Sequence, residues 1–207
     1  MNMERTERIL QVIDRLGAVS VKQLHEILNL GSYRNTCRVV NQLGEYLHQA
    51  RARQKVIYLN KAGREMIGST REVKAGPLLE HTLLVNQAYI YLGCPLDWRR
   101  EYAIEVEKAG GYDYGIKISG MTAVVKKRIV ADAMFSRNGY VHFVEIDNTR
   151  AMRDNQKKIE RYQEIIRMKK MTNAKLYFFT TTVHRKEKLQ KWLSGMNAQV
   201  LTFAEIE

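Results

Sequence analysis

Three carboxylates are the residues of this 207-residue chain whose types and spacing could perform chemistry. Asp132 lies in the segment ADAMFS, and Glu145 and Asp147 lie two positions apart in VEID. Alternate residues of a strand share one face of a sheet, so Glu145 and Asp147 are expected on the same side. Carboxylates grouped in this way can hold Mg²⁺ or Mn²⁺ and activate water for attack on a phosphodiester. The pattern predicts, as one alternative, a metal site at Asp132 and Glu145.

The same carboxylates have a second, purely structural explanation. The segment Asp147-Asn148-Thr149 directly precedes an expected helix, and Asp and Thr side chains commonly cap the first turn of a helix. Asp132 would then only mark the end of a strand. The sequence leaves both explanations open and favours the structural one.

An α/β domain at residues 76–207 is expected to position these carboxylates. Asn138-Gly139 is a strong signal for a two-residue hairpin, which places Asp132 and Glu145 on paired antiparallel strands. Gly110-Gly111 and Gly115 indicate turns before this hairpin. The remaining pattern predicts a mixed α/β sheet. Its other elements are strands near 99–107 and 124–131, a charged helix at 150–170, a strand at 175–182, a helix at 184–194 and a strand near 199–203.

The order of strand with Asp, turn, strand with Glu, and helix resembles the PD-(D/E)XK nuclease fold. Two positions depart from that motif, because Ala131 stands where proline is usual and Asp147 stands where the catalytic lysine is expected. The resemblance implies that Lys157 or Lys158, on the following helix, supplies a displaced ammonium group. It also implies Glu101 as a further candidate carboxylate.

Charge identifies nucleic acid as the leading class of partner. Thirty-four Lys and Arg residues against 22 Asp and Glu give a net charge of +12, which favours polyanions. No apolar run approaches the roughly 20 residues of a membrane span, and no signal-peptide core begins the chain, so a cytoplasmic protein is expected. Cys37 and Cys94 lack metal-binding spacing and are expected to be small buried hydrophobes. No cofactor is expected apart from Mg²⁺ or Mn²⁺ at an active carboxylate site.

Residues 1–70 are predicted to form a winged helix-turn-helix, so that the whole chain is of the α+β class. Apolar periodicity predicts a helix at 4–16, a second helix capped by Ser20, and a third at 33–47 capped by Ser32. The third helix would bury Cys37, Val40, Leu43 and Leu47. A basic hairpin and a short helix at 59–68, capped by Asn60, complete the order.

The outward face of the third helix resembles a DNA-reading surface. Arg, Asn and Gln side chains can bond to base edges in the major groove, and a basic wing can contact phosphates. Residues 32–55 hold five basic residues against Glu45 alone, a net of +4. A protein-binding winged helix with a solvated basic face is the alternative. The predicted DNA-binding residues are Tyr33, Arg34, Asn35, Arg38 and Asn41 on the helix, and Arg51, Arg53 and Lys55 in the wing.

The segment 78–92 predicts a helix that is apolar on much of its circumference. Such a helix is expected to be buried between the domains or in the core of the second. It is also a plausible place for self-contact, since specific DNA binding commonly uses two half-sites, so a homodimer is expected. His81 at its start is expected to be structural.

Six segments follow one another along the chain: IYLNKAGRE at 57–65, LLEHTLLVNQAYI at 78–90, Trp98 with Glu101, ADAMF at 131–135, VEIDNT at 144–149, and Lys158 with Tyr162. With these segments in this order, the chain as a whole resembles the replication-relaxation family, small proteins encoded mainly by plasmids and conjugative elements of Gram-positive bacteria. The resemblance implies a DNA-binding accessory or regulatory protein in plasmid replication, DNA relaxation or conjugative transfer, with the relaxase or replication machinery as further partners. A metal-dependent DNA-nicking endonuclease is the alternative.

Overall fold

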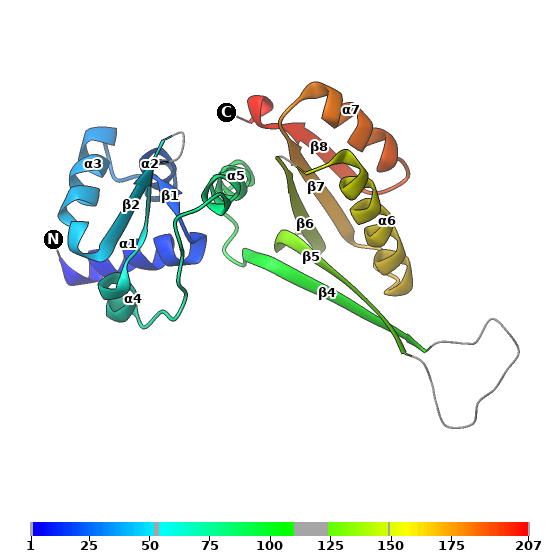
Figure 1. Cartoon of the computed structure of the whole chain (residues 1–207), viewed down its shortest axis with the longest axis horizontal. Coiled ribbons are helices and arrows are strands. Elements are labelled where there is room, and N and C mark those ends of the chain that lie inside the picture. Colours follow the sequence, from blue (N-terminus) through cyan, green and yellow to red (C-terminus); the bar gives the residue numbers. More distant parts are fainter. Residues whose placement is uncertain (1, 52–53, 110–123, 149, 207) are drawn as a thin grey trace, which may run out of the picture. The chain divides into compact units, whose positions relative to one another are not determined.

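The computed structural model describes residues 2–51, 54–109, 124–148 and 150–206. The chain is a mixed α+β protein, as predicted, and divides into two compact units at Met1–Cys94 and Pro95–Glu207. Figure 1 shows helices and a small sheet in the first unit and a larger sheet with helices in the second. None of the described helices is both long and apolar enough to cross a membrane.

The first unit has the predicted order of elements and a three-stranded sheet, β1-β3-β2. The predicted caps are confirmed: the Ser20 side chain forms a capping box with Gln23, Ser32 accepts from the backbone N–H of Asn35, and Asn60 caps the last short helix. The elements are α1 (Met3–Leu16), β1 (Val19–Ser20), α2 (Val21–Leu28), α3 (Tyr33–Gln42), β2 (Leu47–Arg51), β3 (Lys55–Leu59) and α4 (Lys61–Ile67).

The predicted end of the third helix at residue 47 is wrong. Helix α3 ends at Gln42, a 3-10 turn follows at Gly44–Tyr46, and Leu47 already pairs with Leu59 in the hairpin. Gly44 is a poor helix former, which favours the break at this point. The buried residues of α3 are Thr36, Val39 and Val40.

Both cysteines differ from the prediction as well. Cys37 was expected inside the first core, but Val39 takes that place and Cys37 is only half-buried. Cys94 is also half-buried, at the end of the first unit. Val40, Leu43 and Leu47 are buried as predicted, so only Cys37 departs from the predicted inward set of this segment.

Helix α5 (Leu78–Tyr91) groups with the first unit, so the division between units falls after this helix rather than near residue 70. Its contacts explain why. The amide of Asn86 donates to the carbonyl of Ala18 at 2.6 Å, and the amide of Gln23 donates to the carbonyl of Leu83 at 2.7 Å. These bonds satisfy buried polar groups that would otherwise be costly, and they fix α5 against β1 and α2.

The second unit is a five-stranded sheet of order β4-β5-β6-β7-β8, antiparallel from β4 to β6 and parallel from β6 to β8. The hairpin at Asn138-Gly139 is confirmed, since both residues have positive φ and Arg137 pairs with Tyr140. The predicted turns at Gly110-Gly111 and Gly115 lie outside the described residues. The elements are β4 (Arg99–Ala109), β5 (Val124–Arg137), β6 (Tyr140–Asp147), α6 (Met152–Met168), β7 (Ala174–Thr180), α7 (Val183–Trp192) and β8 (Ala198–Thr202).

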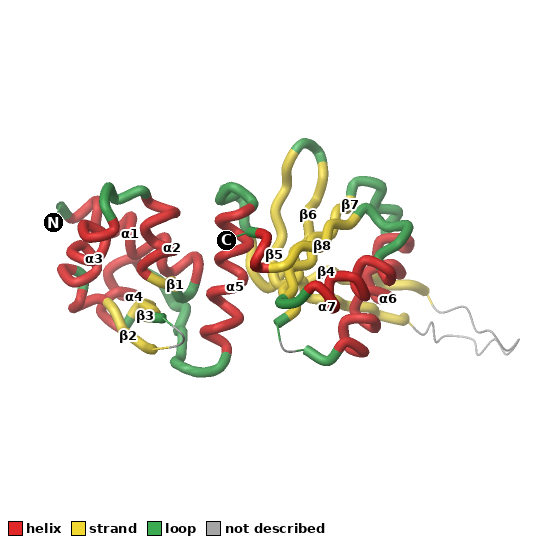
Figure 2. Tube along the Cα trace, turned by 90° about the horizontal axis from the view of Figure 1, so that it is seen from above, coloured by secondary structure: helices red, strands yellow, loops and turns green. Residues whose placement is uncertain are grey.

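Helices α6 and α7 lie on the same face of this sheet, as Figure 1 and Figure 2 show. Ile159, Tyr162 and Ile165 of α6 pack with Phe143 and Phe178 of the sheet. All three α6 residues are buried. The core thus holds α6 directly over the strands that carry Asp132 and Glu145.

Candidate functional site

The pairing of β5 with β6 reaches Ala133 opposite Val144, so Asp132 and Glu145 are the next residues of the two strands, and the charge of Asp132 acts on Glu145. Strand residues three positions apart normally point to opposite faces of a sheet. Ala131 and Met134 are three apart, yet both join the core on the helix side, so the alternation of side chains is broken between them. At this break the carboxylate of Asp132 accepts a hydrogen bond from the backbone N–H of Ile146 at 2.7 Å. Asp132 therefore bonds to the neighbouring strand itself.

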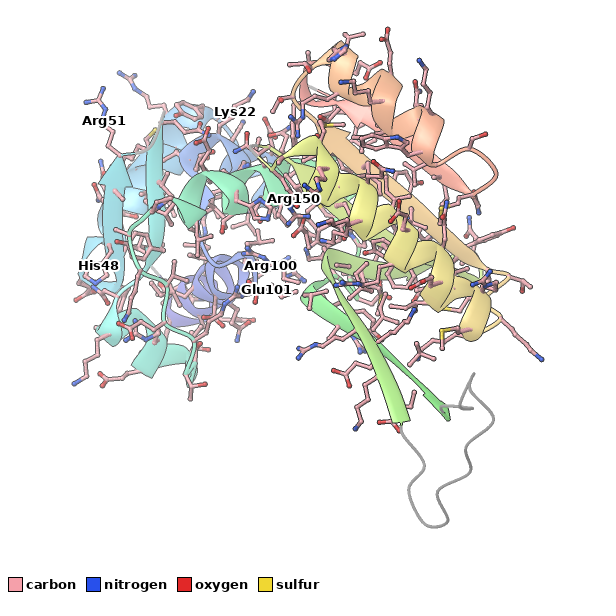
Figure 3. All side chains as sticks on the ribbon, turned by 45° about the vertical axis from the view of Figure 1, so that its right-hand side comes forward. Lys22, His48, Arg51, Arg100, Glu101 and Arg150 are labelled. Carbon is pink, nitrogen blue, oxygen red and sulfur yellow. The ribbon has the colours of Figure 1, made fainter. Side chains whose placement is uncertain are left out.

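Glu101 lies opposite Asp132 on the neighbouring strand β4, since Arg100 pairs with Ala133 and Tyr102 with Ala131. Its backbone is left-handed, with φ 51°, which is uncommon for a residue other than glycine. Figure 3 shows Arg100 and Glu101 at the beginning of β4. The side chain of Glu101 is exposed, so the structure does not bring it into the buried part of the cluster.

Glu145 is the buried centre of the cluster, with 1% of its surface exposed. Lys158 donates to one of its carboxylate oxygens, and the Tyr162 hydroxyl donates to the other at 2.7 Å. Lys158 and Tyr162 are four residues apart on α6 and so share one helix face. The pKa of Glu145 is raised from 4.5 to about 8, because burial and the charge of Asp132 outweigh the opposing effects of Lys158 and Tyr162.

Asp147 is equally buried but has the opposite electrostatics. Its carboxylate accepts from the Arg185 guanidinium, from the Thr180 hydroxyl at 2.7 Å and from the Asn155 amide at 2.6 Å. Burial alone would raise the pKa of Asp147, but the hydrogen bonds from Arg185, Thr180 and Asn155 outweigh it and lower the pKa. Asp147 thus ties β6 to β7, α6 and α7.

The predicted capping of the charged helix by Asp147 is wrong. Helix α6 begins after Ala151 without a side-chain cap, and Thr149 lies outside the described residues. The acceptor capacity of Asp147 is taken up by Arg185, which also donates to the carbonyl of Arg150 at 2.6 Å. A cation from α7 therefore balances the carboxylate that stands in the lysine position of the nuclease motif.

The carboxylates do not fit a divalent cation as they are arranged here. Mg²⁺ requires near-octahedral oxygen ligands. Both oxygens of Glu145 already accept from Lys158 and Tyr162, and both oxygens of Asp147 are bonded to Arg185. Within the described residues, no three His, Cys, Asp or Glu side chains form a group that could hold a metal ion.

A basic groove of about 700 Å³ adjoins this cluster, between β5 and α6. Lys158 belongs to both, while the other predicted lysine, Lys157, is exposed and lines only the groove. Five cationic side chains against one carboxylate suit the groove to a polyanion. The lining residues are Arg128, Ile129, Val130, Arg150, Asp154, Lys157, Lys158 and Arg161.

The predicted DNA-reading residues lie in the first unit on α3 and the β2–β3 hairpin. Tyr33 is 52% exposed, and Arg34, Arg38 and Asn41 are exposed as well. On the hairpin, Arg51 and Lys55 are exposed, and Figure 3 shows Arg51 extending from it. Arg53 lies outside the described residues. A hollow of about 200 Å³ joins α3 to the hairpin, lined by Val21, Lys22, Tyr33, Cys37, Val40, Asn41, Gln54 and Lys55.

Asn35 differs from the other predicted reading residues. It is half-buried, and its amide donates to the carbonyl of Leu30 at 2.6 Å. Its side-chain oxygen accepts from the guanidinium of Arg38 at 2.8 Å. Asn35 therefore holds the start of α3 and orients Arg38.

Four partners of the carboxylate cluster were not anticipated from the sequence: Tyr162 at Glu145, and Asn155, Thr180 and Arg185 at Asp147. Asn155, Thr180 and Arg185 come from three separate elements that only the fold brings to Asp147. The one available signal was Asn155, a small amide on the apolar stripe of α6, which is 1% exposed. Nothing in the local sequence marks Arg185.

Comparisons with known proteins give one structure and one family. A search of curated proteins finds no match. The crystal structure of protein VC1899 from Vibrio cholerae aligns with a TM-score of 0.40 and 14% identity, over 99% of this chain and 50% of that one. This chain thus spans about half the length of that protein.

The family described as replication-relaxation matches residues 4–182. This range runs from α1 past the end of β7 and includes α3, the hairpin, Asp132, Glu145 and Asp147. The chain therefore belongs to the replication-relaxation family, as its motifs predicted.

Proposed function

We propose that this protein is a DNA-binding accessory or regulatory protein of a plasmid or mobile element, acting in replication, DNA relaxation or conjugative transfer. Residues 1–70 would recognise duplex DNA as a winged helix. The observation that carries the proposal is the placement of cationic and amide side chains on the exposed face of α3, beside a basic hairpin.

Each part of this surface has a distinct task. Arg34 and Arg38 have the planar donor geometry that reads guanine edges, and Asn41 can pair with adenine. Arg51 and Lys55, together with Arg53, contact phosphates and set the position of the protein on the duplex. Asn35 keeps Arg38 in the orientation that base reading requires.

Charge favours DNA over the alternative of a protein partner for this surface. Lys22 and Lys55 line the hollow beside α3, and none of the residues lining that hollow is acidic. Lysine is depleted in protein–protein interfaces, so a hollow with two lysines fits a protein partner less well. The excess of cations suits the negatively charged phosphate backbone of DNA.

A second candidate function is metal-dependent nicking of DNA with Asp132, Glu145 and Lys158. One observation favours it: Lys158 lies at Glu145 and lines the basic groove, as a displaced catalytic lysine would. The saturated oxygens of Glu145 and Asp147 disfavour it. We therefore assign the groove to DNA contact or assembly without cleavage.

A homodimer on DNA belongs to the same proposal. One winged helix covers a small footprint, and tight specific binding commonly comes from two half-sites about one helical turn apart. Leu79 and Leu83 of α5 pack in the core of the first unit, whereas Leu78 and Tyr91 are exposed near the ends of the helix. Light scattering is expected to give twice the chain mass on the specific site, and a monomer both free and bound contradicts the dimer.

Binding assays on duplexes from the protein's own genetic neighbourhood test the proposal. A specific site is expected to bind roughly 10³-fold or more tightly than random duplex of equal length at physiological salt. The titration is run with and without Mg²⁺, and affinity is expected not to depend on the metal. Equal affinity for all duplexes contradicts specific recognition, and no binding to any duplex contradicts the proposed function.

A further inference from the structure

A second hollow of about 400 Å³ lies in the second unit at the hairpin end of β6, opposite the end that carries Glu145 and Asp147. It combines aromatic rings, two cations and two amides, and none of its lining residues is acidic. The lining residues are Arg137, Asn138, Tyr140, His142, Lys175, Tyr177 and Asn197.

The inner part of the hollow is aromatic. His142 stacks on Phe135, with ring centres 4.5 Å apart and 6° between the planes, and lies 5.7 Å from the ring of Tyr177. His142 and Tyr177 are buried, whereas Tyr140 at the rim is 44% exposed, with its ring 6.4 Å from that of His142. An exposed ring above an aromatic layer is a platform on which a further flat ring can stack.

Two cations lie beside these rings. The Lys175 ammonium is 4.7 Å from the centre of the Tyr177 ring, and the Arg137 guanidinium is 5.2 Å from the centre of the Phe135 ring. Cation–π contacts hold the charges close to the aromatic layer instead of leaving them free in solvent. The hollow can therefore accept an anion and a flat ring together.

His142 supplies an acceptor that the described protein atoms do not use. Its Nε2 lies 3.3 Å from the carbonyl oxygen of Arg137, and a carbonyl can only accept, so Nε2 carries the proton. Nδ1 is then an acceptor, and it is buried without a partner among the described residues. Burial also lowers the pKa of His142, which keeps the ring neutral. A buried acceptor without a partner is costly, and a ligand or a water molecule can satisfy it.

We propose that this hollow binds a nucleobase that carries a phosphate. The base stacks on Tyr140, Asn138 and Asn197 bond to its edge, and Lys175 and Arg137 neutralise the phosphate. Such a group reaches the site either as a free nucleotide or as part of single-stranded DNA. The site is separate from α3, so it does not depend on the proposed recognition of duplex DNA.

The test measures binding of two probes to the full chain: 5′-dAMP by calorimetry and a fluorescein-labelled ten-nucleotide single strand by polarisation. Stacking of one base on an aromatic ring predicts a loss of roughly five- to hundredfold in the affinity of Tyr140→Ala. Tyr140→Phe is expected to retain affinity. Lys175→Ala is expected to reduce the salt slope of single-strand binding by about 0.7.

Val183→Ala is the control, because Val183 is an exposed apolar residue of the same unit that does not line the hollow. It is expected to leave both affinities within about twofold. Binding of both probes supports a nucleotide pocket, and binding of the single strand alone assigns the site to DNA strands. The proposal is overturned if neither probe binds, or if Tyr140→Ala and Lys175→Ala leave both affinities unchanged. Duplex affinity of the same variants separates this result from the proposed function.

Discussion

The exposed face of α3 and the carboxylate cluster of the second unit use charged side chains in opposite ways. Arg34 and Arg38 present their charges at the surface. Glu145 and Asp147 are each 1% exposed, and their oxygens are bonded to side chains of α6, β7 and α7. A charged group held open to solvent can meet a partner, whereas one that is buried and bonded is engaged within the fold.

The largest effect that tests this comparison is expected at Asp147. Arg185→Ala leaves a buried carboxylate without its cation, which typically costs about 3–5 kcal/mol of folding stability. Both tryptophans, Trp98 and Trp192, lie in the second unit, so tryptophan fluorescence in urea reports the unfolding of that unit alone.

The exposed ion pair of Lys126 with Glu107 provides the matched control, because its side chains are 71% and 60% exposed. Lys126→Ala is expected to change stability by less than about 1 kcal/mol. The lowered pKa of Asp147 adds a pH signature: its stabilisation is present above the unfolded pKa and is lost as pH falls through the lower folded value. Equal losses for Arg185→Ala and Lys126→Ala would contradict a structural role.

Glu145 is expected to respond to pH with the opposite sign. Its pKa is raised from 4.5 to about 8, so the folded state binds the proton more tightly than the unfolded state does. Stability therefore falls as pH rises from about 4.5 to 8, by at most about 1.4 kcal/mol per pH unit. Glu145→Gln, which cannot ionise, is expected to flatten this slope.

The comparison with Asp147→Asn makes the Glu145 experiment specific. Asp147→Asn is expected to remove the loss of folding stability at acid pH and to leave the slope of stability between pH 4.5 and 8 unchanged. Urea titrations at several pH values measure both slopes. An unchanged slope in Glu145→Gln would show that other groups cause the pH dependence.

On α3, the expected effects appear in DNA affinity instead of stability. Arg38→Ala is predicted to cost about 1–3 kcal/mol on the specific duplex and to relax base preference, because Arg38 is assigned to a base edge. Arg51→Ala is predicted to weaken all duplexes alike and to lower the salt slope by about 1, because it is assigned to a phosphate. Polarisation titrations at several salt concentrations separate the two. Equal losses on specific and random duplexes for both variants contradict the assignment.

The contrast between local contacts and contacts between distant residues explains what could be predicted from the sequence. The caps at Ser20, Ser32 and Asn60 and the turn at Asn138-Gly139 depend on a few neighbouring residues, and all four are confirmed. The pairing of the strands with Asp132 and Glu145 followed from that turn.

Features that depend on distant residues could not be derived in this way. The bond between Asp147 and Arg185 joins positions 38 apart on different elements. The grouping of α5 with the first unit rests on Asn86 and Gln23, which bond to backbone carbonyls 68 and 60 positions away. Local periodicity carries no information about such contacts, so the carboxylates were predicted without most of their partners.

The smallest expected effect concerns DNA cleavage, where no activity is predicted. Supercoiled plasmid incubated with pure protein and Mn²⁺ is predicted to remain uncut, and Glu145→Gln is predicted to behave like the natural protein. The reason lies in the occupied oxygens: Lys158 and Tyr162 take up those of Glu145, and Arg185 is bonded to both oxygens of Asp147. A metal would have to displace these donors before it could stabilise the charge of a phosphodiester transition state. Nicking that disappears in Glu145→Gln, while duplex affinity is kept, would establish the endonuclease alternative and show that the cluster rearranges when DNA and metal bind.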